Sequence, residues 1–299
     1  MIKLFHKQKS QVLNLARRFS LGNFGNDNLK SIEDAFCYDL AIIGGGIIGT
    51  SIARKIKNES PNLKTILIEK ESGLGKHQSS HNSGVMHSGI YYKPDSLKAK
   101  FCVKGRRMLK EYCDDNNIPY KNTGKIVTAT DRNQIEILKI LHSQGVENGV
   151  DDLTILKTIE EINEVEPRAK GFQALYSPNT GNIDFQVVAD SFGKDFRKNG
   201  GDILFSNEVK CIKPSSDCDF PILVKCNENL FLKTKYLIIS GGLQSGTLLD
   251  LIDCAAKKCG VFISFRVNYH LLKNGSISRN IYAVPEMDLP FLGIHLSPR

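Results

Sequence analysis

The residues between Tyr38 and Glu69 constrain the fold more than any other portion of the chain. Tyr38–Ile43 is a short β-rich apolar run, GGGIIG follows at 44–49, and the next segment, TSIARKIKNES, predicts a helix. Lys64–Ile68 is a second β-branched run, and Glu69 follows it, about 20 residues after the last glycine. This order and spacing predict a strand, a G-x-G-x-x-G turn, a helix, a second strand and an acid, which together make a βαβ unit.

The glycines and the acid of this unit have distinct physical tasks. Gly44 permits the tight turn, Gly46 lets the backbone approach a pyrophosphate, and Gly49 allows close packing of helix on strand. The free N–H groups at the helix start favour an anion. Glu69 is placed to accept hydrogen bonds from two ribose hydroxyls, and its charge argues against NADP. The unit therefore predicts dinucleotide binding; the alternative is a glycine-rich turn of structural use only.

The segment after the second strand bears on which dinucleotide is bound. Residues 73–92 read GLGKHQSSHNSGVMHSGIYY, a long polar segment rich in glycine and histidine. An NAD-binding domain would continue quickly into its next helix, and a loop of this length inside a compact domain is usually functional. Its backbone donors and hydroxyls suit a second phosphate contact and the edge of a flavin ring. This segment favours FAD over NAD.

Composition and charge exclude several other classes. The 299 residues are 41% hydrophobic and 24% charged, and the apolar runs have the length of strands, so a multipass membrane protein is excluded. The net charge of +8 is concentrated at the N-terminus, because residues 1–26 hold five basic side chains and no acidic one. Without those five, 35 basic residues face 32 acidic ones, so no nucleic-acid partner is expected. The eight cysteines are scattered without metal-ligand spacing, which predicts free thiols and no metal.

The basic N-terminal segment has the character of a mitochondrial presequence. It lacks acidic residues and carries apolar side chains at roughly helical spacing, without the continuous apolar core of a secretory signal. We therefore expect residues 1–36 to be a leader and the protein to be mitochondrial. The alternative is an untargeted basic tail.

Several motifs together resemble one family. YDLAIIGGGIIG, ILIEK, SSHNSGVMHSGIYY and KPDSLKAKFCVKG are similar to the D-amino-acid-oxidase-like FAD-dependent oxidoreductases, and within them to the mitochondrial L-2-hydroxyglutarate dehydrogenases. Four later segments fit as well: TGKIVTAT (123–130), SPNTGNIDFQVVADSF (177–192), KYLIISGGLQS (235–245) and IYAVPEMDLPFLGIHLSPR (281–299). The resemblance implies an α/β protein with a Rossmann-like FAD-binding domain and an interleaved mixed-sheet α+β substrate domain.

The resemblance also implies a reaction and a cofactor site. Such enzymes oxidise the 2-hydroxyl of L-2-hydroxyglutarate to the ketone of 2-oxoglutarate, transfer a hydride to N5 of FAD, and pass the electrons to an acceptor other than oxygen. The acceptor is unknown; the quinone pool and a flavoprotein are open alternatives, as is peripheral association with a membrane. The implied FAD contacts are Gly44, Gly46, Gly49, Glu69, Ser80, Asn82, Ser83, Gly84, Val209, Gly241 and Gly242. For Val209, an ordinary strand valine is the alternative.

A hydroxy-acid dehydrogenase needs a base for the hydroxyl proton and cations for the carboxylates. His87 is the candidate base, because imidazole titrates near neutrality and His87 follows the implied flavin loop. The alternative is that His87 only packs beside the ring or orients the loop. Arg266 is the candidate carboxylate ligand and Tyr91 a second substrate contact. Four weaker candidates for a carboxylate ligand are Lys93, Lys98, Lys100 and Arg299. Lys98 and Lys100 are expected on the solvent-exposed face of an amphipathic helix. The apolar positions of that helix are Leu97, Phe101, Met108, Leu109 and Tyr112.

The chain departs from the family pattern in two places. Val267 and Asn268 stand where the family has glycine and an acid, and a branched residue where glycine allows close approach would either block the flavin or reshape the pocket. The sequence ends at Arg299, whereas the family continues through a further glycine-rich FAD motif and a histidine that could be the base. We therefore expect a fragment, a truncated gene model or a short isoform, whose own activity is open. Another oxidoreductase of this fold, of glycerol-3-phosphate dehydrogenase or amino-acid oxidase type, and a non-catalytic remnant are the competing interpretations.

The predicted organisation alternates between two domains. Helices are expected at 132–148, after a capping box at Thr158, and at 184–198 before Gly200-Gly201, and short successive strands at 230–232 and 236–240. The expected divisions are a leader (1–36), two FAD-binding segments (37–120 and 184–250), and two substrate-domain segments (121–183 and an incomplete 251–299).

Overall fold

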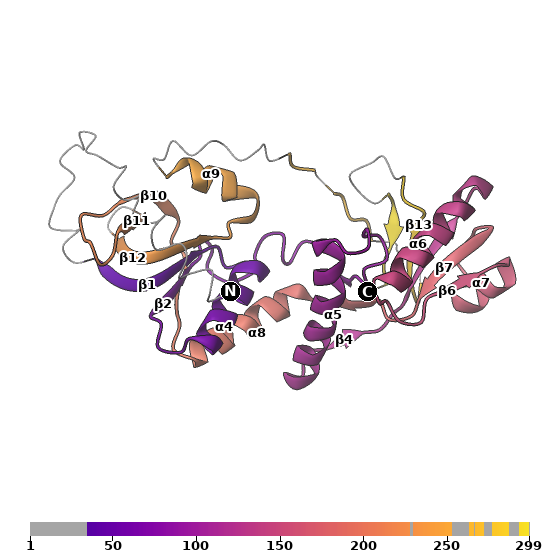
Figure 1. Cartoon of the computed structure of the whole chain (residues 1–299), viewed down its shortest axis with the longest axis horizontal. Coiled ribbons are helices and arrows are strands. Elements are labelled where there is room, and N and C mark those ends of the chain that lie inside the picture. The colour runs from indigo at the N-terminus through magenta and orange to yellow at the C-terminus, as the bar shows by residue number, and fades with distance from the viewer. Residues whose placement is uncertain are drawn as a thin grey trace. The chain divides into compact units, whose positions relative to one another are not determined.

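A computed structural model describes residues 35–227, 230–252, 263–265, 267–271, 277–286 and 293–298 (Figure 1). The chain divides into two compact units, and each unit gathers segments that are distant in sequence. The first comprises the described residues of 1–81 and 185–266, and the second those of 82–184 and 267–299. Residues 1–34 of the predicted leader lie outside the described residues, and Phe36, at its end, opens the first described strand.

The first unit is built on a six-stranded sheet in the order β10-β11-β12-β1-β2-β9. Strands β12, β1, β2 and β9 are parallel, whereas β11 and β10 form an antiparallel extension at one edge. The strands are β1 (Phe36–Ile43), β2 (Thr65–Ile68), β9 (Asp202–Leu204), β10 (Val209–Pro214), β11 (Ile222–Cys226) and β12 (Leu230–Ile239). This arrangement places the ends of β1, β2 and β12 at the same edge, where doubly wound folds bind their ligands.

Both faces of this sheet are covered because β1 is apolar at successive positions. Leu40 and Ile42 face helices α4 (Ile47–Glu59) and α8 (Phe185–Lys198), which lie side by side in Figure 1. Ala41 and Ile43 face the opposite core, which includes β10, β11 and the partly buried Leu248 of α9 (Ser245–Asp250). A strand buried on both faces is typical of a parallel sheet covered on both sides.

The second unit contains two smaller sheets. One has the order β14-β13-β5-β7-β6 with β13 and β5 parallel, and the other is the antiparallel sheet β3-β8-β4. The strands are β3 (Val85–Met86), β4 (Tyr120–Lys121), β5 (Lys125–Ala129), β6 (Thr154–Leu156), β7 (Gln173–Ser177), β8 (Gly181–Ile183), β13 (Asn280–Ala283) and β14 (His295–Leu296). The helices are α5 (Leu97–Asp115), α6 (Ile135–Glu147) and α7 (Ile159–Val165), with 3-10 turns η1 (Arg132–Gln134) here and η2 (Gly242–Gln244) in the first unit.

Alternation along β5 decides which helix covers which face of the five-stranded sheet. Val127 and Ala129 pack against Leu138 and Leu141 of α6, whereas Ile126 packs against Ile162 of α7 and its neighbours. Lys125, two residues before Val127, lies on the α6 side of the same strand. The mixed sheets of this unit agree with the predicted α+β character of the interleaved domain.

Two expectations of local structure need correction, and one predicted domain boundary differs from the compact units. The residues expected to form two strands, 230–232 and 236–240, form the single strand β12, because its ladder with β1 runs from Leu232 to Ile239. Helix α5 buries Ala99, Val103, Tyr112 and Cys113, and leaves exposed three of the apolar side chains expected inside, namely Leu97, Phe101 and Met108. The first compact unit ends its N-terminal stretch at His81, whereas the predicted FAD-binding segment runs to residue 120. The functional division itself stays a prediction.

Two further observations concern only the residues that the structure describes. No helix among them is both long enough and apolar enough to span a bilayer. Their cysteines are free, and they contain no cluster of three or more His, Cys, Asp or Glu side chains suited to a metal ion.

Candidate functional site

The turn between β1 and α4 leaves no room for side chains at two of its glycines. Gly44 has a φ of +103°, and a Cβ there would lie 2.5 Å from the carbonyl oxygen of Ser240. A Cβ on Gly49 would lie 1.9 Å from the carbonyl oxygen of Gly44. Ser240, at the end of β12, donates its backbone N–H and its hydroxyl to the carbonyl oxygen of Ile43 at 2.8 and 2.9 Å. Three chain segments therefore meet at this turn in close backbone contact.

The N-terminus of α4 has the properties of an anion site. The N-cap residue of α4 is Gly46, which has no side chain to cap the helix, and the first turn contains no acidic side chain. The N–H of Ile47 donates to the hydroxyl of Ser79 at 2.9 Å. A Cβ on Gly46 would approach that hydroxyl to 3.3 Å, so the glycine keeps the helix start accessible to a phosphate.

Glu69 is held beside this turn by backbone donors. One carboxylate oxygen accepts from Gly45 N–H at 2.6 Å and the other accepts from Glu71 N–H at 2.9 Å. The side chain is buried, and each oxygen retains a second lone pair. Glu69 thus keeps the acceptor capacity that ribose hydroxyls require.

The other candidate cofactor residues of the first unit have different environments. Gly241 and Gly242 follow Ser240 at the end of β12, and Gly242 has a φ of +57°. Val209 begins β10 at a register shift and is buried in the hydrophobic core. A Cβ on Gly44 would lie 3.2 Å from the Cα of Gly241, so Gly241 lies beside the β1–α4 turn, whereas the position of a Cβ on Gly242 is open space. Val209 has a packing role.

The sequence singled out Ser80, yet the structure places its neighbour Ser79 at the helix start. Ser79 is buried, whereas Ser80 is exposed and bonds the carbonyl oxygen of His77 at 3.1 Å and the ring of His81 at 2.9 Å. Two adjacent serines in a glycine-rich loop are equivalent in sequence. Their difference is one of burial, for which the local pattern contains no signal.

The remaining loop candidates belong to the second unit. Asn82 accepts a hydrogen bond from Gly84 N–H at 2.7 Å, which closes an Asx turn. Gly84 has a φ of +70° and its carbonyl oxygen accepts from Ile183 N–H at 2.8 Å, so the turn is anchored on β8. Ser83 is half-buried, and its hydroxyl is hydrogen-bonded to Tyr282.

Downstream of this turn, the side chains of the second unit converge on Lys125. The Lys125 Nζ lies 4.2 Å from the ring centroid of Tyr91 and 3.7 Å from that of Tyr282. The Tyr282 ring stacks on His295, with 4.5 Å between centroids and 10° between planes. His87 is also close enough for the charge of Lys125 to affect it. This group, here called the Lys125 cluster, joins the candidate base His87 and the candidate substrate contact Tyr91.

Burial controls the ionisation of the cluster. Burial, with the positive charges of Lys125 and His295 as lesser causes, lowers the pKa of His87 to about 4. Burial lowers the pKa of Lys125 well below its usual value and raises the pKa of Tyr282 to about 12. His87 in this environment is a neutral imidazole at physiological pH and a weak base, unless a negative charge enters the cluster.

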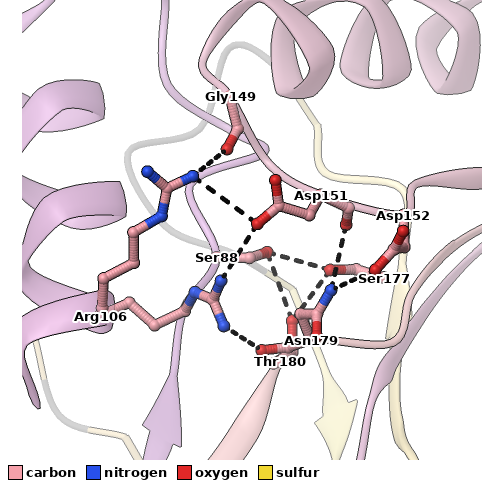
Figure 2. A network of polar contacts seen from close by, with 9 residues as sticks. Ser88, Arg106, Gly149, Asp151, Asp152, Ser177, Asn179 and Thr180 are labelled. Atoms are coloured by element: carbon pink, nitrogen blue, oxygen red, sulfur yellow. Dashed lines mark hydrogen bonds and ion pairs between the residues drawn. The ribbon is translucent and has the colours of Figure 1, made fainter. Parts of the chain in front are cut away.

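A polar network within the second unit holds Ser88 against β7 and the turn that follows it (Figure 2). Ser88 is hydrogen-bonded to Ser177 at 3.2 Å and to Thr180 at 3.3 Å, and all three hydroxyl groups are buried. Arg106 of α5 donates to the carbonyl oxygen of Asn179 at 2.8 Å. The residue directly after His87 is therefore held by β7 and the turn that follows it.

The candidate cations differ in what the structure shows of them. Arg266 and Arg299 lie outside the described residues. Lys98 and Lys100 are exposed on α5, as expected, although three of the five apolar residues assigned to its buried face are exposed too. Lys93 is also exposed. Lys125 was missed, because a lysine that opens a strand carries no sign of its burial.

A profile of the family described as "FAD dependent oxidoreductase" (DAO) matches residues 39–299. The chain belongs to this family. FAD is the cofactor of the family, and the β1–α4 turn fits it: the backbone approaches closely, the helix start lacks a side-chain cap of its own, and Glu69 retains free lone pairs. The predicted fold class is thereby confirmed, with mixed sheets beside the dinucleotide-binding unit.

Curated relatives and solved structures agree with this assignment. Proteins called "L-2-hydroxyglutarate dehydrogenase, mitochondrial" are 40% identical in Nematostella vectensis, 43% in Caenorhabditis elegans and 40% in Homo sapiens, over 99%, 90% and 88% of this chain. The chain covers 67%, 63% and 58% of these relatives, respectively. The FAD-bound L-alpha-glycerophosphate oxidase of Mycoplasma pneumoniae superposes with a TM-score of 0.72 at 25% identity, covering 88% of this chain and 68% of that one.

Proposed function

We propose that this chain is a portion or all of an FAD-dependent dehydrogenase that converts L-2-hydroxyglutarate to 2-oxoglutarate. The observation that carries the proposal is the similarity of about 40% identity to curated L-2-hydroxyglutarate dehydrogenases, which extends across both compact units. The geometry of the β1–α4 turn supports the cofactor assignment independently.

In this proposal the first unit holds the cofactor. The start of α4 binds the pyrophosphate, Glu69 accepts hydrogen bonds from the ribose hydroxyls, and Gly241 lies beside the same turn, with Gly242 as a further candidate contact. Asn82, Ser83 and Gly84 remain candidate FAD contacts. FAD, when bound, supplies the acceptor for the hydride that leaves C2 of the substrate.

The second unit contributes the groups that handle the substrate. His87 is the candidate base for the hydroxyl proton, and Tyr91 is a candidate substrate contact. The low pKa of His87 in the free protein makes it an effective base only after an anionic substrate has raised that pKa. A role for His87 in orienting the loop alone is the competing assignment. Arg266 remains a candidate carboxylate ligand.

The cellular setting is also proposed from the relatives and the leader. The relatives are named mitochondrial, and residues 1–36 have the composition of a presequence. We place the protein in mitochondria, with electrons passed to the quinone pool or a flavoprotein and with peripheral contact to a membrane as one arrangement. Import of a fusion of residues 1–36 to a reporter into isolated mitochondria tests the location; a fusion that stays outside contradicts it.

Visible spectra test the activity. The purified chain is reconstituted with FAD and titrated anaerobically with L-2-hydroxyglutarate, with the D-isomer, L-glycerol 3-phosphate and glycine as controls. Bleaching of the flavin band by the L-hydroxy acid alone is the expected result. Bleaching by L-glycerol 3-phosphate or glycine instead identifies another activity of this fold. Flavin that binds but is not reduced by any substrate refutes catalysis by this chain, and failure to bind flavin refutes the cofactor assignment.

A further inference from the structure

Lys125 is the least expected polar residue of the second unit. It opens β5 on the same face as Val127 and Ala129, two residues of the α6-side core, and its exposed fraction is 1%. Among the described residues, its Nζ has neither a hydrogen-bond partner nor an ion-pair partner. Buried lysines are almost always paired, so an unpaired one requires a physical reason.

The described residues around Lys125 supply no carboxylate to balance its charge. The faces of the Tyr91 and Tyr282 rings lie against Nζ, and such faces stabilise a cation. His87, His295 and the Cys102 thiol complete the titratable groups that face it. The described residues of the cluster thus combine an amine, two imidazoles, two phenols and a thiol without any carboxylate.

A second polar atom in the cluster is also without a partner. The hydroxyl of Tyr91 is buried and makes no hydrogen bond with the described residues. An O–H group and an ammonium group are both donors, and a carboxylate has lone pairs for both. One carboxylate would therefore accept from two buried donors that have no partner among the described residues, and it would supply a counter-charge that those residues lack.

We propose that Lys125 and Tyr91 bind a carboxylate group of the substrate, with His87 and His295 at the border of the same anion site. This rests on the proposed function, because that function requires a substrate with two carboxylates. The site assigns one of them to the second unit. It also places the carboxylate close to His87, where its negative charge makes the imidazole a stronger base.

Binding of glutarate, which has both carboxylates but no hydroxyl to oxidise, tests the site. Calorimetry on the full FAD-reconstituted chain compares the parent with Lys125→Met, whose side chain has a similar length and no charge. We expect Lys125→Met to weaken glutarate binding by about tenfold or more. The matched control is Lys121→Met, an exposed lysine four residues earlier, which should bind like the parent. A loss of less than about threefold in Lys125→Met, or no glutarate binding by the parent, overturns the proposal.

A second variant covers the case in which Lys125→Met does not fold. Tyr91→Phe keeps the ring over Nζ and removes only the unpaired hydroxyl, so its stability should equal or exceed that of the parent. Its affinity for glutarate should fall by about fivefold; an unchanged affinity contradicts the assignment.

The failure of the site and the failure of the proposed function give different results. If the flavin is reduced by L-2-hydroxyglutarate but Lys125→Met leaves KM and glutarate binding unchanged, only the site is refuted. If glutarate binds through Lys125 but L-2-hydroxyglutarate does not reduce the flavin, only the activity is refuted.

Discussion

Gly44 and Gly49 show how a single residue can determine a site. Their missing Cβ atoms allow the backbone of the β1–α4 turn to touch the end of β12 and the start of the helix. The G-x-G-x-x-G spacing predicted a tight turn at Gly44 and close packing at Gly49, because that spacing reports a local backbone requirement. It could not separate Ser79 from Ser80 or reveal Lys125, because those distinctions depend on which distant segment packs above them.

Alanine at Gly44 tests this local requirement. The substitution forces a side chain into a positive-φ conformation and against the Ser240 carbonyl, so we expect the free energy of unfolding to fall by about 2–4 kcal/mol and FAD binding to be lost. Gly105→Ala is the matched control: Gly105 lies in α5 with open space around its Cβ position, and alanine there should stabilise by about 0.5–1 kcal/mol. Urea titrations that give both variants the same stability would contradict the argument.

His87 gives a residue-scale prediction about pH. Its pKa is about 4 in the folded protein, whereas an unperturbed histidine has a pKa of about 6.5, so the unfolded chain binds a proton first as the pH falls. The free energy of unfolding should therefore decrease between about pH 6.5 and pH 4, by up to about 3 kcal/mol from this group. In His87→Gln this contribution disappears, so the stability of the variant relative to the parent should rise on acidification. If the free energies of unfolding of His87→Gln and the parent changed in parallel with pH, this contribution of His87 would be excluded.

At the scale of elements, Glu166 joins chain segments that are more than a hundred residues apart. It follows α7, and its carboxylate accepts from the N–H groups of Arg168, Ser278 and Arg279 and from the Ser278 hydroxyl. Burial by itself raises the pKa of Glu166, yet these hydrogen bonds outweigh burial and lower the pKa. The contact holds the segment that leads into β13, which pairs with β5 next to Lys125.

Removal of this carboxylate should loosen β13. Glu166→Ala removes a buried carboxylate and the four hydrogen bonds that it accepts, and we expect a loss of about 2–4 kcal/mol in the free energy of unfolding. Hydrogen exchange should show lower protection of Asn280–Ala283 in this variant. Glu164→Ala, an exposed change in the same helix, should stay within about 0.5 kcal/mol of the parent. An equally protected β13 in Glu166→Ala would show that the strand does not depend on this contact.

At the scale of the whole molecule, each compact unit is assembled from separated segments, and the comparisons extend through both. A ligand held by the first unit should stabilise that unit by mass action. FAD at about 100 times its Kd should add about 2.7 kcal/mol to the free energy of unfolding, and Glu69→Ala should reduce this gain at the same FAD concentration because the acceptor for the ribose is lost. Glu59→Ala at the other end of α4 should retain it. Thermal melts with and without FAD measure the difference.

Features whose hydrogen bonds and turns are local could be predicted from the sequence. The βαβ unit, helices α4, α6 and α8, and the exposed lysines of α5 follow from short-range spacing. The continuity of β12, the buried face of α5 and the meeting of side chains in the Lys125 cluster emerged only from the folded chain. Periodicity in the sequence indicates only which residues of one helix or strand lie on the same face. Packing between distant segments depends on the sheet order, which no local pattern contains, and that is why no pattern in the sequence indicated that Lys125 is buried.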